Sequence, residues 1–171
     1  GIVNYLEDLT KDVEVISSMY TQKKYIENNE HDSFSKGEGG EWAIVWCEEG
    51  NHKESYVNLI PTSSGGTHES GFRNGIFEAI KSFCDQHSLL PRGVKLSADD
   101  AWQNVWFVLS TRILDPQFQG QLKDKLNNRV AVRLISSLVK DDFEHWLNQN
   151  IEEGKKIAEL AIKQAQIRNK K

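Results

Sequence analysis

A nearly uninterrupted run of β-forming residues, 105–113, limits the folds open to this chain more than any other segment. Its valine, tryptophan, phenylalanine, leucine and isoleucine side chains fit a strand whose surroundings are apolar. We expect it to be a central strand of a sheet. A polar loop, 115–123, follows, and its glycine, proline, amides and lysine are typical of a loop that presents polar groups from a rigid base.

The other elements are predicted from periodicity and caps. Apolar spacing of three or four predicts helices over 1–10, after residue 68, from Asn127 or Asn128 onward, and over about 151–169. Further strands are predicted over 13–16, 19–26, 42–47 and 55–60. The last two are expected to pair as an antiparallel hairpin. The order predicts an α+β domain with helices on one face of a mostly antiparallel sheet and a long C-terminal helix.

Composition fits one ordinary domain. The chain has 171 residues, of which 38% are apolar and 27% charged, and its formal net charge is −4. This acidity argues against a protein that binds DNA over its whole surface. From residue 155 onward, however, six basic residues stand against a single Glu159. That end fits either a solvated helix face or a local phosphate contact. No run has the length of a membrane span or the pattern of a signal peptide.

Several residues that could carry chemistry have simpler explanations. Cys47 and Cys84 lie in apolar segments, and we interpret them as small buried residues in a reducing cytosol. Cys84 and His87 are three residues apart, but two ligands do not make a zinc site, and no metal site is predicted. Asp99 and Asp100 follow a serine at a helix start, so capping explains them better than catalysis does.

A second polar loop, 62–68, joins a predicted strand to a predicted helix. Gly65 and Gly66 allow a sharp turn of the backbone, and the helix start beyond them has free N–H groups that favour an anion. The residues alone fit an ordinary strand-to-helix turn whose glycines serve its geometry.

Five segments carry a resemblance to a known family. They are 56–68, Gly-Phe-Arg at 71–73, Leu-Pro-Arg-Gly-Val-Lys-Leu-Ser-Ala at 90–98, the loop 115–123, and Trp-Leu-Asn-Gln-Asn at 146–150. Together they resemble the B subunit of bacterial type IIA topoisomerases, and their sequences are closer to topoisomerase IV than to gyrase. The match covers most of 41–171 and, more weakly, 1–40. It is to one domain of that subunit, the transducer, whose fold is the ribosomal protein S5 domain 2-like α+β fold.

The resemblance implies which residues meet the nucleotide and the DNA. In the family, a Gln-Thr-Lys sequence in this loop reaches the γ-phosphate of ATP. By position these contacts fall on Gln121 and Lys123, and Leu122 stands where the family has threonine. Arg73 matches an arginine that faces the transported DNA duplex. Without the family, Arg73 would be interpreted as a solvated arginine on a helix.

The resemblance also implies cofactors and partners. The whole protein is expected to use ATP with Mg²⁺, and to couple ATP turnover to DNA strand passage, relaxation and decatenation. Its partners would be DNA and the topoisomerase IV A subunit, in a heterotetramer of two A and two B subunits in the bacterial cytoplasm, associated with the chromosome. The ATPase and Toprim domains should lie outside this chain, with 151–171 leading toward the Toprim domain. Alone, the chain should be monomeric, hold no cofactor and be inactive.

Two alternatives remain open on the sequence. The same domain of the gyrase B subunit is the near alternative. A small RNA-binding module of the same S5-like fold is the more remote one, and the net charge of −4 speaks against it, because such a module needs a basic face.

Overall fold

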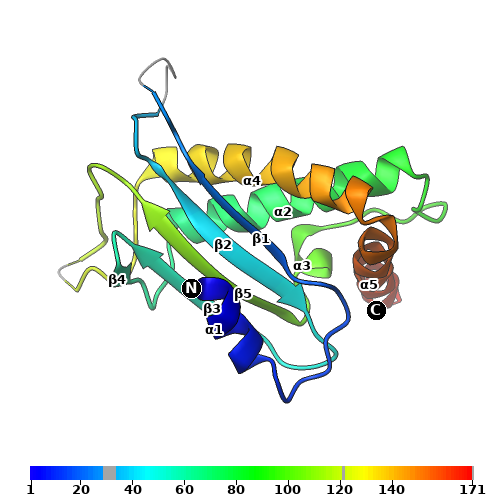
Figure 1. Ribbon diagram of the computed structural model, residues 1–171. Coiled ribbons are helices and arrows are strands. Elements are labelled where there is room, and N and C mark those ends of the chain that lie inside the picture. The colour runs from blue at the N-terminus through cyan, green and yellow to red at the C-terminus, as the bar shows by residue number, and fades with distance from the viewer. Residues whose placement is uncertain (29–33, 121, 171) are drawn as a thin grey trace.

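The computed structural model describes residues 1–28, 34–120 and 122–170. At its centre is a five-stranded sheet with the order β1-β2-β5-β3-β4 (Figure 1). The strands are β1 Tyr20–Tyr25, β2 Gly39–Trp46, β3 His52–Val57, β4 Ile60–Pro61 and β5 Val105–Arg112. β3 and β5 are parallel, and the other three pairings are antiparallel. The predicted α+β class and mostly antiparallel sheet are confirmed.

The predicted central strand is confirmed, since β5 lies between β2 and β3. The predicted hairpin between 42–47 and 55–60 is therefore wrong. Seven of the eight residues of β2 are buried, whereas only two of the six in β3 are. Five of the eight residues of β5 are buried. Pairing the two most apolar strands removes more apolar surface from water than pairing neighbours in sequence would.

The predicted strands 55–60 and 13–16 also differ from the structure. The stretch 55–60 is broken by a two-residue turn, because Asn58 and Leu59 have φ values of 50° and 69°. Two successive positive φ values are typical of a type I′ hairpin turn, which here joins β3 to β4. Residues 13–16 do not form the predicted strand, and Val15 makes only an isolated bridge to Cys47.

The helices are α1 Ile2–Leu9, α2 Thr67–Gln86, α3 Ala98–Ala101, α4 Arg129–Gln149 and α5 Ile151–Asn169. α2 and α4 lie side by side along one face of the sheet (Figure 1). They can approach closely because Gly71 has no side chain. A Cβ at this position would lie 2.6 Å from the carbonyl oxygen of Val132. The shorter α1 lies on the opposite face, where Leu6 joins a small apolar cluster with Val45 and Val108.

The long C-terminal helix α5 is confirmed at its predicted bounds and packs against α3. Arg168 donates hydrogen bonds of 3.0 and 3.2 Å to the carboxylate of Asp100 and one of 2.9 Å to the carbonyl of Lys95. Asp100 also accepts from the backbone N–H of Ser97 and completes the predicted cap of α3. α3 is thus held at its start and by a neighbouring helix.

Two loops meet at one end of the sheet: the β4–α2 loop, residues 62–66, and the β5–α4 loop, residues 113–128. Cys47 and Cys84 are buried and free of a disulfide, as expected. Across the described ranges, no group of three or more His, Cys, Asp or Glu side chains could hold a metal ion. Among the helices of that same part of the chain, none has the length and apolarity needed to cross a membrane.

Candidate functional site

Leu126 joins the two loops. Its N–H donates to the carbonyl of Gly65 at 3.0 Å, and its own carbonyl accepts from the N–H of Thr67 at 3.1 Å. Beside it, Ser64 donates twice to Asp124, from its backbone N–H at 2.8 Å and from its hydroxyl to the carboxylate at 2.9 Å. Leu126 is buried. The β5–α4 loop is therefore fixed to the start of α2.

Lys123 lies on the exposed part of this loop, one residue before Asp124. Its φ is 56°, a left-handed conformation that is uncommon for residues other than glycine. No described residue forms an ion pair or hydrogen bond with its ammonium group. Leu122 is 84% exposed, and Gln121 lies outside the described residues. The side chain of Lys123 is therefore exposed to solvent.

A buried polar network lies beneath the β4–α2 loop. The Thr62 hydroxyl is 2.7 Å from the Ser55 hydroxyl and 2.9 Å from Nε2 of His68, which is itself 3.1 Å from the Ser55 hydroxyl. Ser55 in turn donates to the carboxylate of Glu69. Burial lowers the pKa of His68 to about 4, so its imidazole is neutral at pH 7.

This network contains the residue types of a serine hydrolase but cannot act as one. Ser55 is 3% exposed and His68 is fully buried, so no substrate carbonyl can reach the hydroxyl. Nε2 of His68 lies within hydrogen-bonding distance of both neighbouring hydroxyls, whereas Nδ1 has no hydrogen-bond partner among the described residues. The network instead fixes the turn from which the β4–α2 loop holds Leu126.

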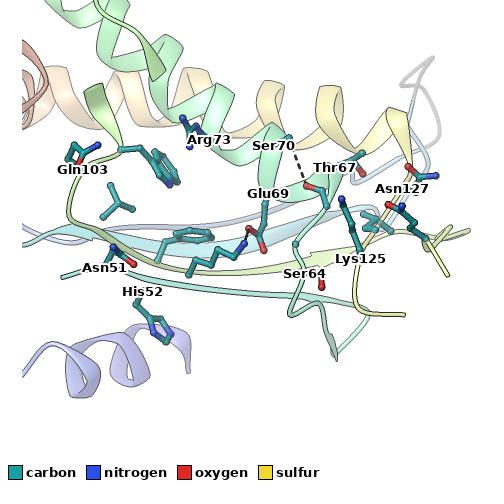
Figure 2. Close-up of a pocket in the computed structure, with 18 of the residues that line it drawn as sticks. Asn51, His52, Ser64, Thr67, Glu69, Ser70, Arg73, Gln103, Lys125 and Asn127 are labelled. Carbon is teal, nitrogen blue, oxygen red and sulfur yellow. Dashed lines mark hydrogen bonds and ion pairs between the residues drawn. The ribbon is translucent and has the colours of Figure 1, made fainter. Parts of the chain in front are cut away.

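A cleft of about 680 Å³ opens between β3, the start of α2 and the β5–α4 loop. Figure 2 shows the side chains that line it. Three of them are basic: Lys53 from β3, Arg73 from α2 and Lys125 from the β5–α4 loop. Glu69 lies 3.8 Å from the ammonium of Lys53. Most other lining groups can form hydrogen bonds, including Asn51, Gln103, Asn104, Gln119 and Asn127.

Of the predicted site residues, Arg73 and Lys123 are described by the structure, and they lie on different surfaces. Arg73 lies in the cleft, where it pairs with Asp99 and its guanidinium carbon is 5.8 Å from the ring centroid of Trp102. Lys123 does not line the cleft, but Lys125 on the same loop does. Sequence reasoning missed Lys53 and Lys125. The position of Lys125, two residues beyond Lys123, was the one available signal.

The fold matches parts of known topoisomerase structures. The ATP-binding domain of topoisomerase IV from Francisella tularensis superposes with a TM-score of 0.73 at 42% identity, over 81% of this chain and 39% of that chain. The 43K ATPase domain of Thermus thermophilus gyrase B superposes with a TM-score of 0.84, over 99% of this chain and 44% of that chain. Its 22% identity shows the fold alone. Both matches show an α+β fold that also occurs within longer topoisomerase chains.

Sequence comparison then gives the family. The family described as DNA gyrase B matches residues 1–171, so the chain belongs to it. The B subunit of DNA topoisomerase 4 from Escherichia coli K12 is 42% identical over 170 residues, which is 98% of this chain. The protein of the same name from Salmonella typhimurium LT2 is 49% identical over 133 residues, or 77% of this chain. The chain spans 26% and 21% of the lengths of these two relatives, respectively.

Proposed function

We propose that this chain is the transducer domain of a topoisomerase IV B subunit. It would couple ATP binding and hydrolysis in an adjacent ATPase domain to the passage of one DNA duplex through another. The relatives named as B subunits of topoisomerase 4, at 42% and 49% identity, favour this protein over the B subunit of gyrase. The observation that carries the proposal is the Lys123 ammonium, unpaired among the described residues, on a loop anchored to α2.

In this proposal Lys123, together with Gln121, contacts the γ-phosphate of ATP. A hydrogen bond between charged groups contributes about 1.5–3 kcal/mol to stability. A free-energy difference of about 1.4 kcal/mol changes an equilibrium constant tenfold. This contact can therefore change the equilibrium constant between two domain orientations by about one or two orders of magnitude. Loss of the γ-phosphate would release the lysine and with it the preferred orientation. Nucleotide turnover would become movement in this way.

The residues of this chain fit a partial nucleotide site. They offer the ammonium of Lys123 on the β5–α4 loop, and the described residues contain no cluster that could hold Mg²⁺. The magnesium ligands and the adenine pocket would belong to the ATPase domain, elsewhere in the protein. When bound, ATP supplies the γ-phosphate that is cleaved, and Lys123 orients it and stabilises its charge.

A displacement of the β5–α4 loop would be transmitted through α2 to Arg73, the proposed DNA-contacting residue. Leu126 is bonded to Thr67, the first residue of α2, and Arg73 lies six residues further along the same helix. At 1.5 Å per residue this is a distance of about 9 Å along a rigid element. The cleft that contains Arg73, Lys53 and Lys125 would face the phosphates of the transported duplex.

The rest of the protein would supply the remaining parts of the machine. The chain would be a single domain followed by a Toprim domain, to which α5 leads. Two such B subunits would act with two A subunits, whose tyrosines cleave the DNA, and together they would relax and decatenate DNA in the bacterial cytoplasm.

Limited trypsin digestion of the full-length B subunit tests whether Lys123 meets the γ-phosphate. Trypsin cuts after Lys123 and Lys125, which are both exposed. A non-hydrolysable ATP analogue should slow these cuts several-fold, whereas ADP should leave them unchanged. Cleavage after the exposed Arg92, which lies between α2 and α3, is the internal control. Equal protection by ADP and by the analogue would contradict a contact with the γ-phosphate.

A further inference from the structure

We propose that Asp99 is an internal competitor for DNA, and that binding of a duplex in the cleft exchanges the carboxylate of Asp99 for a DNA phosphate on Arg73. The inference rests on the proposed DNA role of Arg73 and adds to it a residue that sets how readily the site is occupied. The sequence explains Asp99 as a capping residue, but in the structure its neighbour Asp100 provides the cap contacts of α3.

Arg73 makes one contact with α3 and one with Trp102, the residue after α3. Nη2 of Arg73 donates to the carboxylate of Asp99, and the guanidinium lies 5.8 Å from the ring centroid of Trp102. Asp99 lies in α3 and Trp102 is the residue directly after it, so both contacts come from the same short segment. That helix is held in place by Asp100 and Arg168. An anchored element therefore presents the carboxylate to Arg73.

A phosphate can replace this carboxylate because both groups accept the same hydrogen bonds from a guanidinium. The Asp99 side chain is 79% exposed, so it can turn into water when a duplex arrives. An ion pair this exposed is weak, and it alters an equilibrium constant by no more than about fivefold. A duplex brings several phosphates at once, and Lys125 in the same cleft has no acidic partner among the described residues.

Asp99 reaches Arg73 from beside the cleft, whereas the acidic side chain that lines the cleft, Glu69, is not suited to exchange. Glu69 pairs with Lys53, but its side chain is only 13% exposed and accepts a hydrogen bond from the buried Ser55. Turning Glu69 into water would break the network that fixes the β4–α2 loop. Asp99 pairs with Arg73 and takes no part in that network. Its removal from Arg73 therefore costs only the ion pair itself.

The test measures how much linear duplex DNA is needed to stimulate ATP hydrolysis by the full-length B subunit assembled with its A subunit. The variants are Asp99→Asn, Asp99→Ser and Asp85→Asn. Asp85 is an exposed acid near the far end of α2, so its substitution changes the net charge equally without touching the cleft. Each is also made in the Arg73→Gln background.

We expect both Asp99 variants to reach half-maximal stimulation at about two- to fivefold less DNA than Asp85→Asn. The gain should shrink as potassium chloride rises, because exposed charges are screened. It should vanish in the Arg73→Gln background. If Asp99→Asn behaves like Asp85→Asn, or needs more DNA than wild type, the exchange is contradicted. In that case a loss of stimulation in Arg73→Gln would still support the proposed DNA role of Arg73. If Arg73→Gln has no effect, that DNA role fails and the exchange with it.

Discussion

Gly66 and Leu126 pack backbone against backbone. A Cβ on Gly66 would lie 2.3 Å from the carbonyl oxygen of Leu126 and 2.5 Å from its nitrogen, and Gly66 has a φ of 134°. No other residue type fits there, because the space and the backbone conformation both exclude a side chain. The glycine is thus required where the β5–α4 loop is fixed to the start of α2.

Gly66→Ala should destabilise this chain by about 2–4 kcal/mol, since the strained φ and the overlap with Leu126 add together. It should also release the loop, so that trypsin cuts faster after Lys123 and Lys125. Gly93→Ala is the matched control, because Gly93 has a φ of 80° and an added Cβ would meet no heavy atom within 4 Å. It should cost about 1 kcal/mol and leave the loop unchanged. Equal loss in both variants would show that the contact with Leu126 does not matter.

His68 should make the stability of the domain depend on pH. Its pKa in the folded state is about 4, below the ordinary value near 6.5. Between these pH values His68 is protonated in the unfolded chain and neutral in the folded chain. The free energy of unfolding should therefore fall as the pH drops from about 6.5 to 4, by up to about 3 kcal/mol.

Urea unfolding of His68→Gln at several pH values checks this prediction. The variant should be less stable at pH 7, because the hydroxyls of Ser55 and Thr62 lose their partner, and it should lose most of the slope between pH 4 and 6.5. The exposed His145, substituted by glutamine, should keep the slope. A slope that survives in His68→Gln would assign the effect to another group.

The ion pair between Arg168 of α5 and Asp100 of α3 should contribute most to the stability of the fold at neutral pH. Burial would raise the pKa of Asp100, but the hydrogen bonds from Arg168 and Ser97 outweigh it and hold the pKa below the ordinary value. A carboxylate of this kind stabilises the fold above its ordinary pKa near 4, and the contribution is lost as the pH falls below that. Arg168 supplies two of these hydrogen bonds.

Arg168→Ala should therefore lower the Tm at pH 7 by about 2–4 °C. The deficit should shrink below pH 4, where Asp100 becomes protonated. Lys163→Ala removes an exposed basic residue from the same helix and should leave the Tm unchanged. A deficit that is as large at pH 3 as at pH 7 would argue that Arg168 acts through packing alone.

The helices could be predicted because their signals are local. The apolar stripe of α4, the cap of α3 and the bounds of α5 follow from residues three or four apart. The order of the strands could not be predicted in this way. β5 inserts between β2 and β3 from about fifty residues further along the chain, and that choice depends on packing of both faces.

The candidate site was predictable only in part. Lys123 and Arg73 came from the resemblance to a family, since in isolation a loop lysine and a helix arginine look like solvated side chains. The network of Ser55, Thr62 and His68 gave no signal, because its members lie on separate elements and polar residues near a turn usually face water. The pairing of Arg73 with Asp99 spans 26 residues and depends on how α2 packs against α3.

The most direct test of nucleotide sensing by the β5–α4 loop is the ATPase rate of the full-length B subunit with Lys123→Ala, measured beside nucleotide affinity. The rate should fall by about a hundredfold or more while nucleotide still binds, because the lysine stabilises charge that develops during turnover. Lys81→Ala, an exposed lysine on α2, is the control and should keep the wild-type rate. An unchanged rate in Lys123→Ala would leave the fold and family standing but remove the nucleotide contact from this loop, with Leu122 the first residue to examine.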